Sequence, residues 1–332
     1  ALLIANVINL GADIGAMVAA LPLLVSDPAF PYTAAFVLLS IGLQVFVPFK
    51  FYSPLLKVLT LSLFAYVATA FAIKVPWHDV LRGVFLPHIS INAKYAMAIV
   101  AVMGTTISPY LFFWQAAQEV EEVRDTGNRR KPLKQAPTQG PDALQRIGLD
   151  TVTGMLVSEI VAFFIILTAA VALHAHGKPD ITTSAEAAAA LRPLAGRFAS
   201  ALFAAGIIGT GLLAVPVLAG SAAFGVAEAF KEPSGLEHKV SHAKLFYAVL
   251  IIAGALGLAL NVLPIDPVKA LYWSAVINGV AAVPIMVAIM IFSMSLRDMG
   301  KFVLPPWLQV LGWAATLVMA AAAVVMFATW GR

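Results

Sequence analysis

A proline in the middle of an apolar segment is the feature of this sequence with the clearest chemical consequence. Pro109 follows the residues Gly-Thr-Thr-Ile-Ser at 104–108, inside an apolar segment at about 93–118. Proline has no N–H, so a helical carbonyl at Thr105 would lose its partner, and the ring disfavours helical geometry at Ser108. Irregular backbone at membrane depth is tolerated where it is buried in protein or lines a watery cavity. The segment therefore predicts a broken helix beside a cavity, and the alternative is a proline kink satisfied by the hydroxyls of Thr105 and Thr106.

Polar side chains in two other apolar segments are further candidates for a function at membrane depth. Asn6, Asn9 and Asp13 have the spacing i, i+3 and i+7, which places them on one face of a helix. They line an aqueous path or form a hydrogen-bond network between helices, and both alternatives stay open. Glu159 is a carboxylate within an apolar segment, so it is a functional candidate, with a neutral, structural hydrogen-bond donor as the alternative.

The elements that must position these residues are apolar helices. Hydrophobic residues make up 61% of the chain and charged residues only 11%, which excludes an ordinary soluble domain. The mean hydropathy is +0.91. We expect an all-α polytopic membrane protein, a single transmembrane transporter domain over 1–332, with about nine transmembrane helices. Their approximate bounds are 2–25, 32–48, 54–74, 93–118, 150–175, 196–228, 243–263, 266–294 and 305–330.

Charged residues indicate how the chain is oriented. The densest basic cluster, Arg124 to Arg146, lies in a predicted cytoplasmic loop at 119–149, as the positive-inside rule expects. The net charge of +4 is spread over loops between apolar segments, so we expect no nucleic-acid partner. His78 and His88 fall in a predicted external loop without the spacing of a zinc site.

Residues 104–115, GTTISPYLFFWQ, resemble the NRAMP family of divalent-metal transporters, in which a GATVMPHNLYLHS-like sequence breaks the sixth membrane helix at the ion site. Residues 9–15, NLGADIG, are similar to the family's third helix, where D-x-A-E-V-I-G is usual. Residues 206–211, GIIGTG, are similar to its eighth helix. The order and spacing of these motifs extend the resemblance over nearly the whole chain.

This resemblance implies a LeuT-type fold of two inverted repeats, with an ion bound at the membrane midplane between broken helices. It also implies that the nine segments are helices three to eleven. We therefore expect the chain to be truncated at its N-terminus, without the two helices that include an Asp-Pro ion ligand. The metal ligands it implies here are the Thr105 carbonyl and Ser108, and Asn278 lies where the family often has a polar residue near the ion, with helix packing as the alternative.

Departures from the family pattern bear on which ion is carried. Ser108 stands where the family has a methionine whose thioether contacts the metal. Thioethers favour soft transition metals, whereas hydroxyl and carbonyl oxygens suit Mg²⁺ and Mn²⁺. The change resembles the NRAMP-related magnesium transporters. The alternative is that the Ser108 hydroxyl only bonds locally at the helix break.

Other departures bear on proton coupling. Tyr110 and Gln115 occupy positions that are histidine in proton-coupled members, and Asn9 and Ala12 fall where those members have Asp and Glu. Membrane proton relays need such titratable groups, so we expect transport without proton coupling. Asp13 lies one residue beyond the position at which the family has Glu. It is the one titratable residue within the motif at 9–15.

The sequence therefore predicts a transporter of divalent cations, Mg²⁺ or Mn²⁺, in a lipid bilayer, most simply a bacterial inner membrane. It predicts no cofactor beyond the transported ion and leaves the oligomeric state open. The alternatives are a proton-coupled Mn²⁺/Fe²⁺ NRAMP transporter and a LeuT-type carrier of an organic solute. No HExxH, GxSxG or P-loop motif is present, so we do not expect an enzyme.

Overall fold

The computed structural model describes most of the chain and is helical wherever it describes regular structure. The described ranges are 2–24, 61–73, 75–87, 89–90, 92–125, 136–172, 196–236, 238–261 and 266–330, with isolated positions between 35 and 58 and at 188 and 263. The predicted helix at 32–48 lies outside the described residues except for a few isolated positions, as does the first part of the one at 54–74. The chain divides into two compact units, which are described separately.

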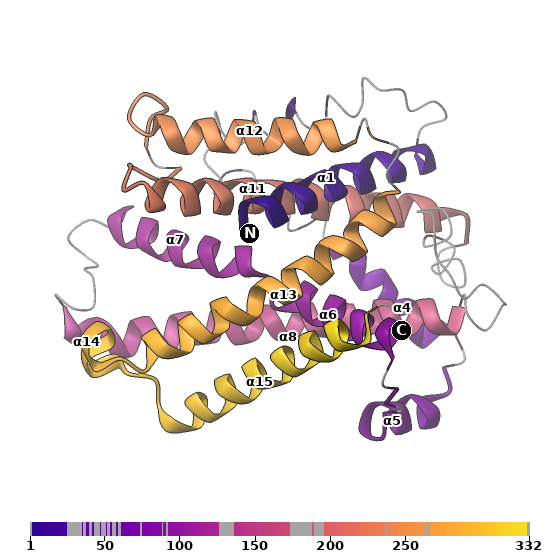
Figure 1. Cartoon of the computed structure of the whole chain (residues 1–332). Helices are drawn as coiled ribbons and strands as arrows, with labels where there is room; N and C mark the ends of the chain where they lie inside the picture. The colour runs from indigo at the N-terminus through magenta and orange to yellow at the C-terminus, as the bar shows by residue number, and fades with distance from the viewer. Residues whose placement is uncertain are drawn as a thin grey trace. The chain divides into compact units, whose positions relative to one another are not determined.

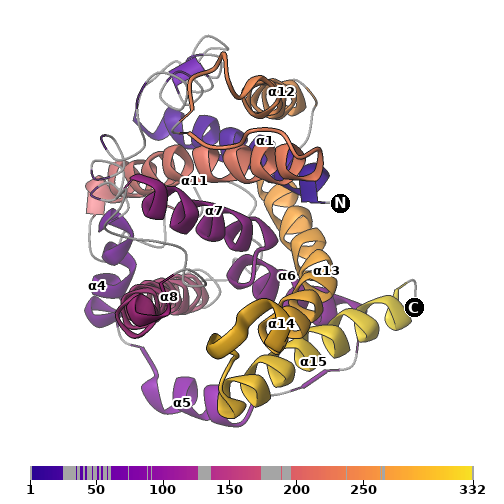
Figure 2. The same cartoon turned by 90° about the vertical axis from the view of Figure 1, so that its left-hand side faces the viewer.

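Unit 1 contains the predicted break and comprises residues 1–5, 90–153 and 272–332. Its main helices are α6 (Ala93–Thr106), α7 (Pro109–Asp125), the first part of α8 (Gly140–Ala172), most of α13 (Pro267–Ser293), α14 (Leu296–Met299) and α15 (Pro306–Thr329). Ala96, Val100 and Ala101 of α6 pack with Ala275 and Val276 of α13 and Met326 of α15. In both views α15 runs beside α6 (Figures 1 and 2).

Unit 2 comprises residues 6–89 and 154–271. It contains most of α1 (Leu2–Ala20), α4 (Phe64–Ala72), α5 (Trp77–Phe85), the second part of α8, α11 (Ala199–Ala229) and α12 (Lys244–Leu260). The helices α1, α11 and α12 lie side by side in both views (Figures 1 and 2). Small residues allow this packing, because a Cβ at Gly11 would meet Leu260 of α12 and a Cβ at Gly211 would meet Met17 of α1.

Six helices in the described part of the chain are long and apolar enough to cross a membrane. They are Leu3–Leu23, Ala93–Glu121, Pro137–Val171, Ala199–Ala229, Val268–Ser293 and Pro306–Thr329. Apolar helices of this length satisfy most of their own backbone hydrogen bonds, which the bilayer core requires. The span Ala93–Glu121 differs from the others because it is interrupted between Thr106 and Pro109. The prediction of an all-α polytopic membrane protein is confirmed. The inverted repeats implied by the resemblance stay a prediction.

Helix bounds around the predicted cytoplasmic loop differ from those expected. Helix α7 continues to Asp125, and α8 begins at Gly140 after a short 3-10 turn at Pro137–Gln139, so both helices extend into 119–149. Glutamate and glutamine are good helix formers, which favours the extension of α7. Proline and aspartate in the first turn of α8 are residues that favour a helix start.

Candidate ion site at the helix break

The apolar segment at 93–118 is two helices that separate at Ile107 and Ser108. Helix α6 starts with an N-cap at Asn92, whose side chain accepts a hydrogen bond from the backbone N of Tyr95 over 2.8 Å. It ends at Thr106, and α7 begins at Pro109. The backbone N–H at the first position of a helix has no partner within that helix, so a proline there loses no hydrogen bond. Pro109 can therefore start α7, although it prevents α6 from continuing. The predicted break is therefore present at the predicted residues.

The Ser108 hydroxyl takes over the bond that Pro109 cannot make. This side chain is only 2% exposed. Its hydroxyl donates to the carbonyl oxygen of Gly104 over 2.7 Å and to that of Thr105 over 3.1 Å. The Thr105 hydroxyl is not involved, since it donates instead to the carbonyl of Val102 over 2.7 Å. The Thr105 carbonyl is thus not bare, and the local bonding weighed as the alternative for Ser108 is the arrangement found.

Close packing brings α13 against the last turn of α6. A Cβ added at Gly104 would fall on the carbonyl oxygen of Ala275 and the backbone N of Gly279, and one added at Gly279 would meet Val100. These obstacles include backbone atoms, which cannot rotate aside. Glycine at both positions therefore lets the two backbones approach directly beside the break.

Asn278 belongs to this same part of α13. It is adjacent to Gly279 and three residues from Ala275, both of which touch Gly104. Its side chain is 3% exposed, and its amide oxygen has no hydrogen-bond partner among the described residues. A buried oxygen without a hydrogen-bond partner destabilises the fold by about 1–3 kcal/mol. A water or a cation that binds such an oxygen would remove this cost. Thr105, Ser108 and Asn278 of unit 1 thus present a carbonyl, a hydroxyl and an amide oxygen that could bind an ion.

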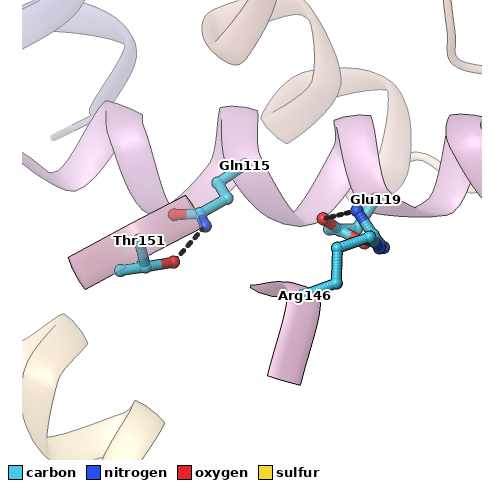
Figure 3. Close-up of polar contacts among 4 residues, drawn as sticks. All are labelled: Gln115, Glu119, Arg146 and Thr151. Atoms are coloured by element: carbon cyan, nitrogen blue, oxygen red, sulfur yellow. Dashed lines mark hydrogen bonds and ion pairs between the residues drawn. The ribbon is translucent and has the colours of Figure 1, made fainter. Parts of the chain in front are cut away.

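Two polar contacts hold α7 against the first part of α8, as Figure 3 shows. The side-chain amide of Gln115 donates to the hydroxyl of Thr151 over 3.1 Å. One turn further, Arg146 and Glu119 form an ion pair at 2.7 Å. Tyr110 is half-buried in the first turn of α7. Like Gln115, it stands at a position where histidine is expected in a proton-coupled protein.

The remaining candidates lie in unit 2. Asn6 is buried, and its amide donates to the hydroxyl of Ser221 over 2.7 Å and to the carbonyl of Leu218 over 3.2 Å, both on α11. Hydrogen bonding between helices, one of the two alternatives for this face, is therefore present at Asn6.

Asn9 and Asp13, which share the predicted face with Asn6, and Glu159 on α8 differ in burial. Asn9 is buried, Asp13 is half-buried on the same helix, and Glu159 is exposed on α8. The predicted roles of these three residues in a transport pathway stay predictions.

The structural roles of several residues that shape the site were not predicted from the sequence. Gly104 and Gly279 set the approach of α6 to α13, and Arg146 and Thr151 bind α7 to α8. Glycines within apolar helices are a signal for close helix contacts, and this signal was available. The partners Arg146 and Thr151 had no local signal, because they lie 27 and 36 residues from Glu119 and Gln115.

Fold and break together define a polytopic membrane protein with a discontinuous helix, and comparison with known proteins places it in a family. The family described as Nramp, natural resistance-associated macrophage protein-like, matches residues 1–329. The chain belongs to this family.

Curated relatives are similar at low identity. Proteins named divalent metal cation transporter MntH from Bradyrhizobium diazoefficiens, Klebsiella pneumoniae and Verminephrobacter eiseniae are 24%, 22% and 25% identical over 274, 273 and 270 residues. The alignments cover 78%, 80% and 80% of this chain but only 56%, 60% and 56% of those proteins. The chain thus spans little more than half the length of the curated relatives it matches.

Proposed function

We propose that this chain is the core of a divalent metal cation transporter, with the ion bound at the break between α6 and α7. The observation that carries the proposal is the break itself, where the Thr105 carbonyl in the last turn of α6 lies beside the buried Ser108 side chain. Membership of the Nramp family and the printed names of the MntH relatives support the ion class. Those relatives are bacterial, so we propose a bacterial inner membrane as the location.

The local hydrogen bonds at the break are compatible with ion binding. The hydroxyl of Ser108 uses its proton in the bonds to Gly104 and Thr105, which leaves its oxygen lone pairs available. A carbonyl oxygen likewise has two lone pairs, and one donor occupies only one of them at Thr105. The bonds therefore fix the orientation of the two oxygens before an ion arrives, and fixed ligands lose less entropy on binding.

The proposed ions are Mg²⁺ and Mn²⁺. Thr105, Ser108 and Asn278 would present carbonyl, hydroxyl and amide oxygens, which suit hard ions. None of these three residues carries a sulfur atom, and the chain has no cysteine. Since Mg²⁺ keeps several of its waters when proteins bind it, few protein ligands are needed at the site.

We further propose that transport is not coupled to protons. Gln115 and Tyr110 do not titrate near neutral pH, and Gln115 is engaged with Thr151. Asn9 and Ala12 likewise cannot carry a proton along α1.

Selectivity measured in liposomes tests the proposal. The whole protein should admit Mg²⁺ and Mn²⁺, and Cd²⁺ should compete poorly. Ser108→Met should raise the uptake of Cd²⁺ relative to Mg²⁺ by about five- to thirty-fold, because one soft ligand is worth on the order of 1–2 kcal/mol. Thr106→Met is the matched control, since it adds the same sulfur two residues away from the proposed ligand. Tight binding of Cd²⁺ by the unaltered protein, or equal shifts in both variants, would contradict the proposal.

A further inference from the structure

Helix α5 (Trp77–Phe85) is amphipathic, although it lies in a segment expected to be an external loop. At about 100° per residue, Trp77, Val80, Leu81, Val84 and Phe85 form one continuous apolar face. The opposite face carries His78, Asp79, Arg82 and Gly83. This separation is typical of a helix that lies between an apolar and a polar medium.

The described residues of unit 2 leave this apolar face largely uncovered. None of the residues of α5 is buried, and Val80 is the only one that is half-buried, against a cluster that includes Leu167 and Val171 of α8. Leu81, Val84 and Phe85 are 55%, 54% and 77% exposed. Within unit 2, α5 stands apart from the α1, α11 and α12 layer in both views (Figures 1 and 2).

Water alone does not favour such a helix. Isolated helices shorter than about 12–15 residues are marginal in water, and α5 has nine residues, one of them glycine. An apolar medium against its exposed face would supply the missing stabilisation.

Aromatic contacts join α5 to the surface that faces lipid. The ring of Trp77 lies 5.9 Å from that of Phe71 at the end of α4, and Phe71 lies 5.8 Å from Phe164 of α8. Helix α8 is a candidate membrane span, and its residues Phe163 and Ile166 in this region are exposed. Tryptophan concentrates where a membrane meets water, because its ring has an apolar body and a polar N–H. The apolar face of α5 is thus continuous with a lipid-facing surface.

We propose that α5 lies flat in the interface of the bilayer, with Leu81, Val84 and Phe85 among the acyl chains and Arg82 and Asp79 toward water. In this position it anchors the connection between α4 and α6 at the membrane surface. The exposed residues Leu86 and Ile89, which follow α5, extend the same apolar surface.

Nitroxide labels at single cysteines test this placement, because the chain contains no cysteine of its own. Variants Leu81→Cys and Phe85→Cys probe the apolar face, and His78→Cys and Arg82→Cys probe the polar face, each in the whole protein in liposomes. Collisions with oxygen, which enriches in lipid, and with a water-soluble nickel chelate are measured by electron paramagnetic resonance. Leu317→Cys on α15 and Glu232→Cys after α11 serve as lipid and water references.

The expected result is that the collision frequencies of the labels alternate along α5 with the period of a helix. Labels at positions 81 and 85 should resemble the label at 317, with frequent oxygen collisions and a loss of nickel collisions, and labels at 78 and 82 should resemble the label at 232. Nickel collisions at all four positions would overturn the proposal by showing a helix in water. Shielding from both reagents at 81 and 85 would also overturn the proposal, because protein would then cover the apolar face. Spin–spin broadening at these positions would identify a second copy of this chain as the covering protein.

Discussion

The carbonyl oxygen of Thr105 accepts a hydrogen bond from the hydroxyl of Ser108 over 3.1 Å, across the break between α6 and α7. The donor that would occupy this place in a continuous helix is the backbone N–H of residue 109, which proline lacks. The oxygen is thereby held at the break and keeps a lone pair for an ion.

Replacing Pro109 by alanine should therefore reduce metal uptake, although no charged group changes. Alanine restores the N–H that can bond to Thr105 and permits α6 and α7 to join, which removes a ligand. Initial rates of Mn²⁺ uptake into liposomes measure the effect. Pro284→Ala, which removes a proline from within α13 and leaves the break intact, should keep most of the uptake. Normal rates in Pro109→Ala would assign the break a structural role only.

Gly104→Ala should destabilise the protein by about 1–3 kcal/mol, the usual cost of overpacking. The new Cβ would collide with backbone atoms of Ala275 and Gly279, so α6 and α13 would have to separate. Gly148→Ala on α8 is the matched control, because nothing lies within 4 Å of its added Cβ. In an exposed helix interior this change should stabilise by roughly 0.5–1 kcal/mol. Thermal unfolding in detergent compares the two, and equal unfolding temperatures would refute the close packing.

The ion pair of Glu119 and Arg146 should contribute a coupling of about 0.2–1 kcal/mol, since both side chains are partly exposed. A double-mutant cycle of Glu119→Gln and Arg146→Gln measures it from the unfolding free energies of the four proteins. The coupling should shrink at high salt. Additive effects in the cycle would show that this contact does not hold α7 to α8.

The break and most helices could be predicted from the sequence, because their causes are local. A proline within an apolar segment specifies the end of α6 and the start of α7, and long apolar runs specify the membrane helices. Helix α5 was missed because Pro76 and Pro87 bracket it and its nine residues are too few for a membrane span. Its apolar residues at 77, 80, 81, 84 and 85 were the signal that could have found it.

The surroundings of the break could not be predicted, because they depend on contacts between distant residues. The bond from Gln115 to Thr151 and the approach of Gly104 to Ala275 join segments that share no local pattern. The role of Ser108 was left open for a related reason. Residue type alone does not distinguish a hydroxyl that bonds to its own helix from one that also binds an ion, because the same oxygen can do both.

Metal uptake should leave the lumenal pH unchanged, since the family's titratable positions are Asn9, Ala12, Tyr110 and Gln115 in this chain. A pH-sensitive dye trapped in the liposomes measures this during Mn²⁺ uptake. Asp13→Asn is the accompanying variant, because Asp13 is the titratable group of that motif and is half-buried in α1. Stoichiometric acidification that disappears in Asp13→Asn would assign proton coupling to this residue and contradict the account.

Anomalous scattering from bound Mn²⁺ tests the central claim most directly, because it locates the ion without relying on transport rates. Diffraction data from crystals of the whole protein grown with Mn²⁺ should show a peak between α6 and α7. Its centre should lie within about 2.5 Å of the Thr105 carbonyl oxygen, the range of cation–oxygen bonds. The peak should weaken in Pro109→Ala and persist in Thr105→Ala, since the proposed ligand is backbone. A strong peak elsewhere, with none beside Thr105 and Ser108, would contradict the account.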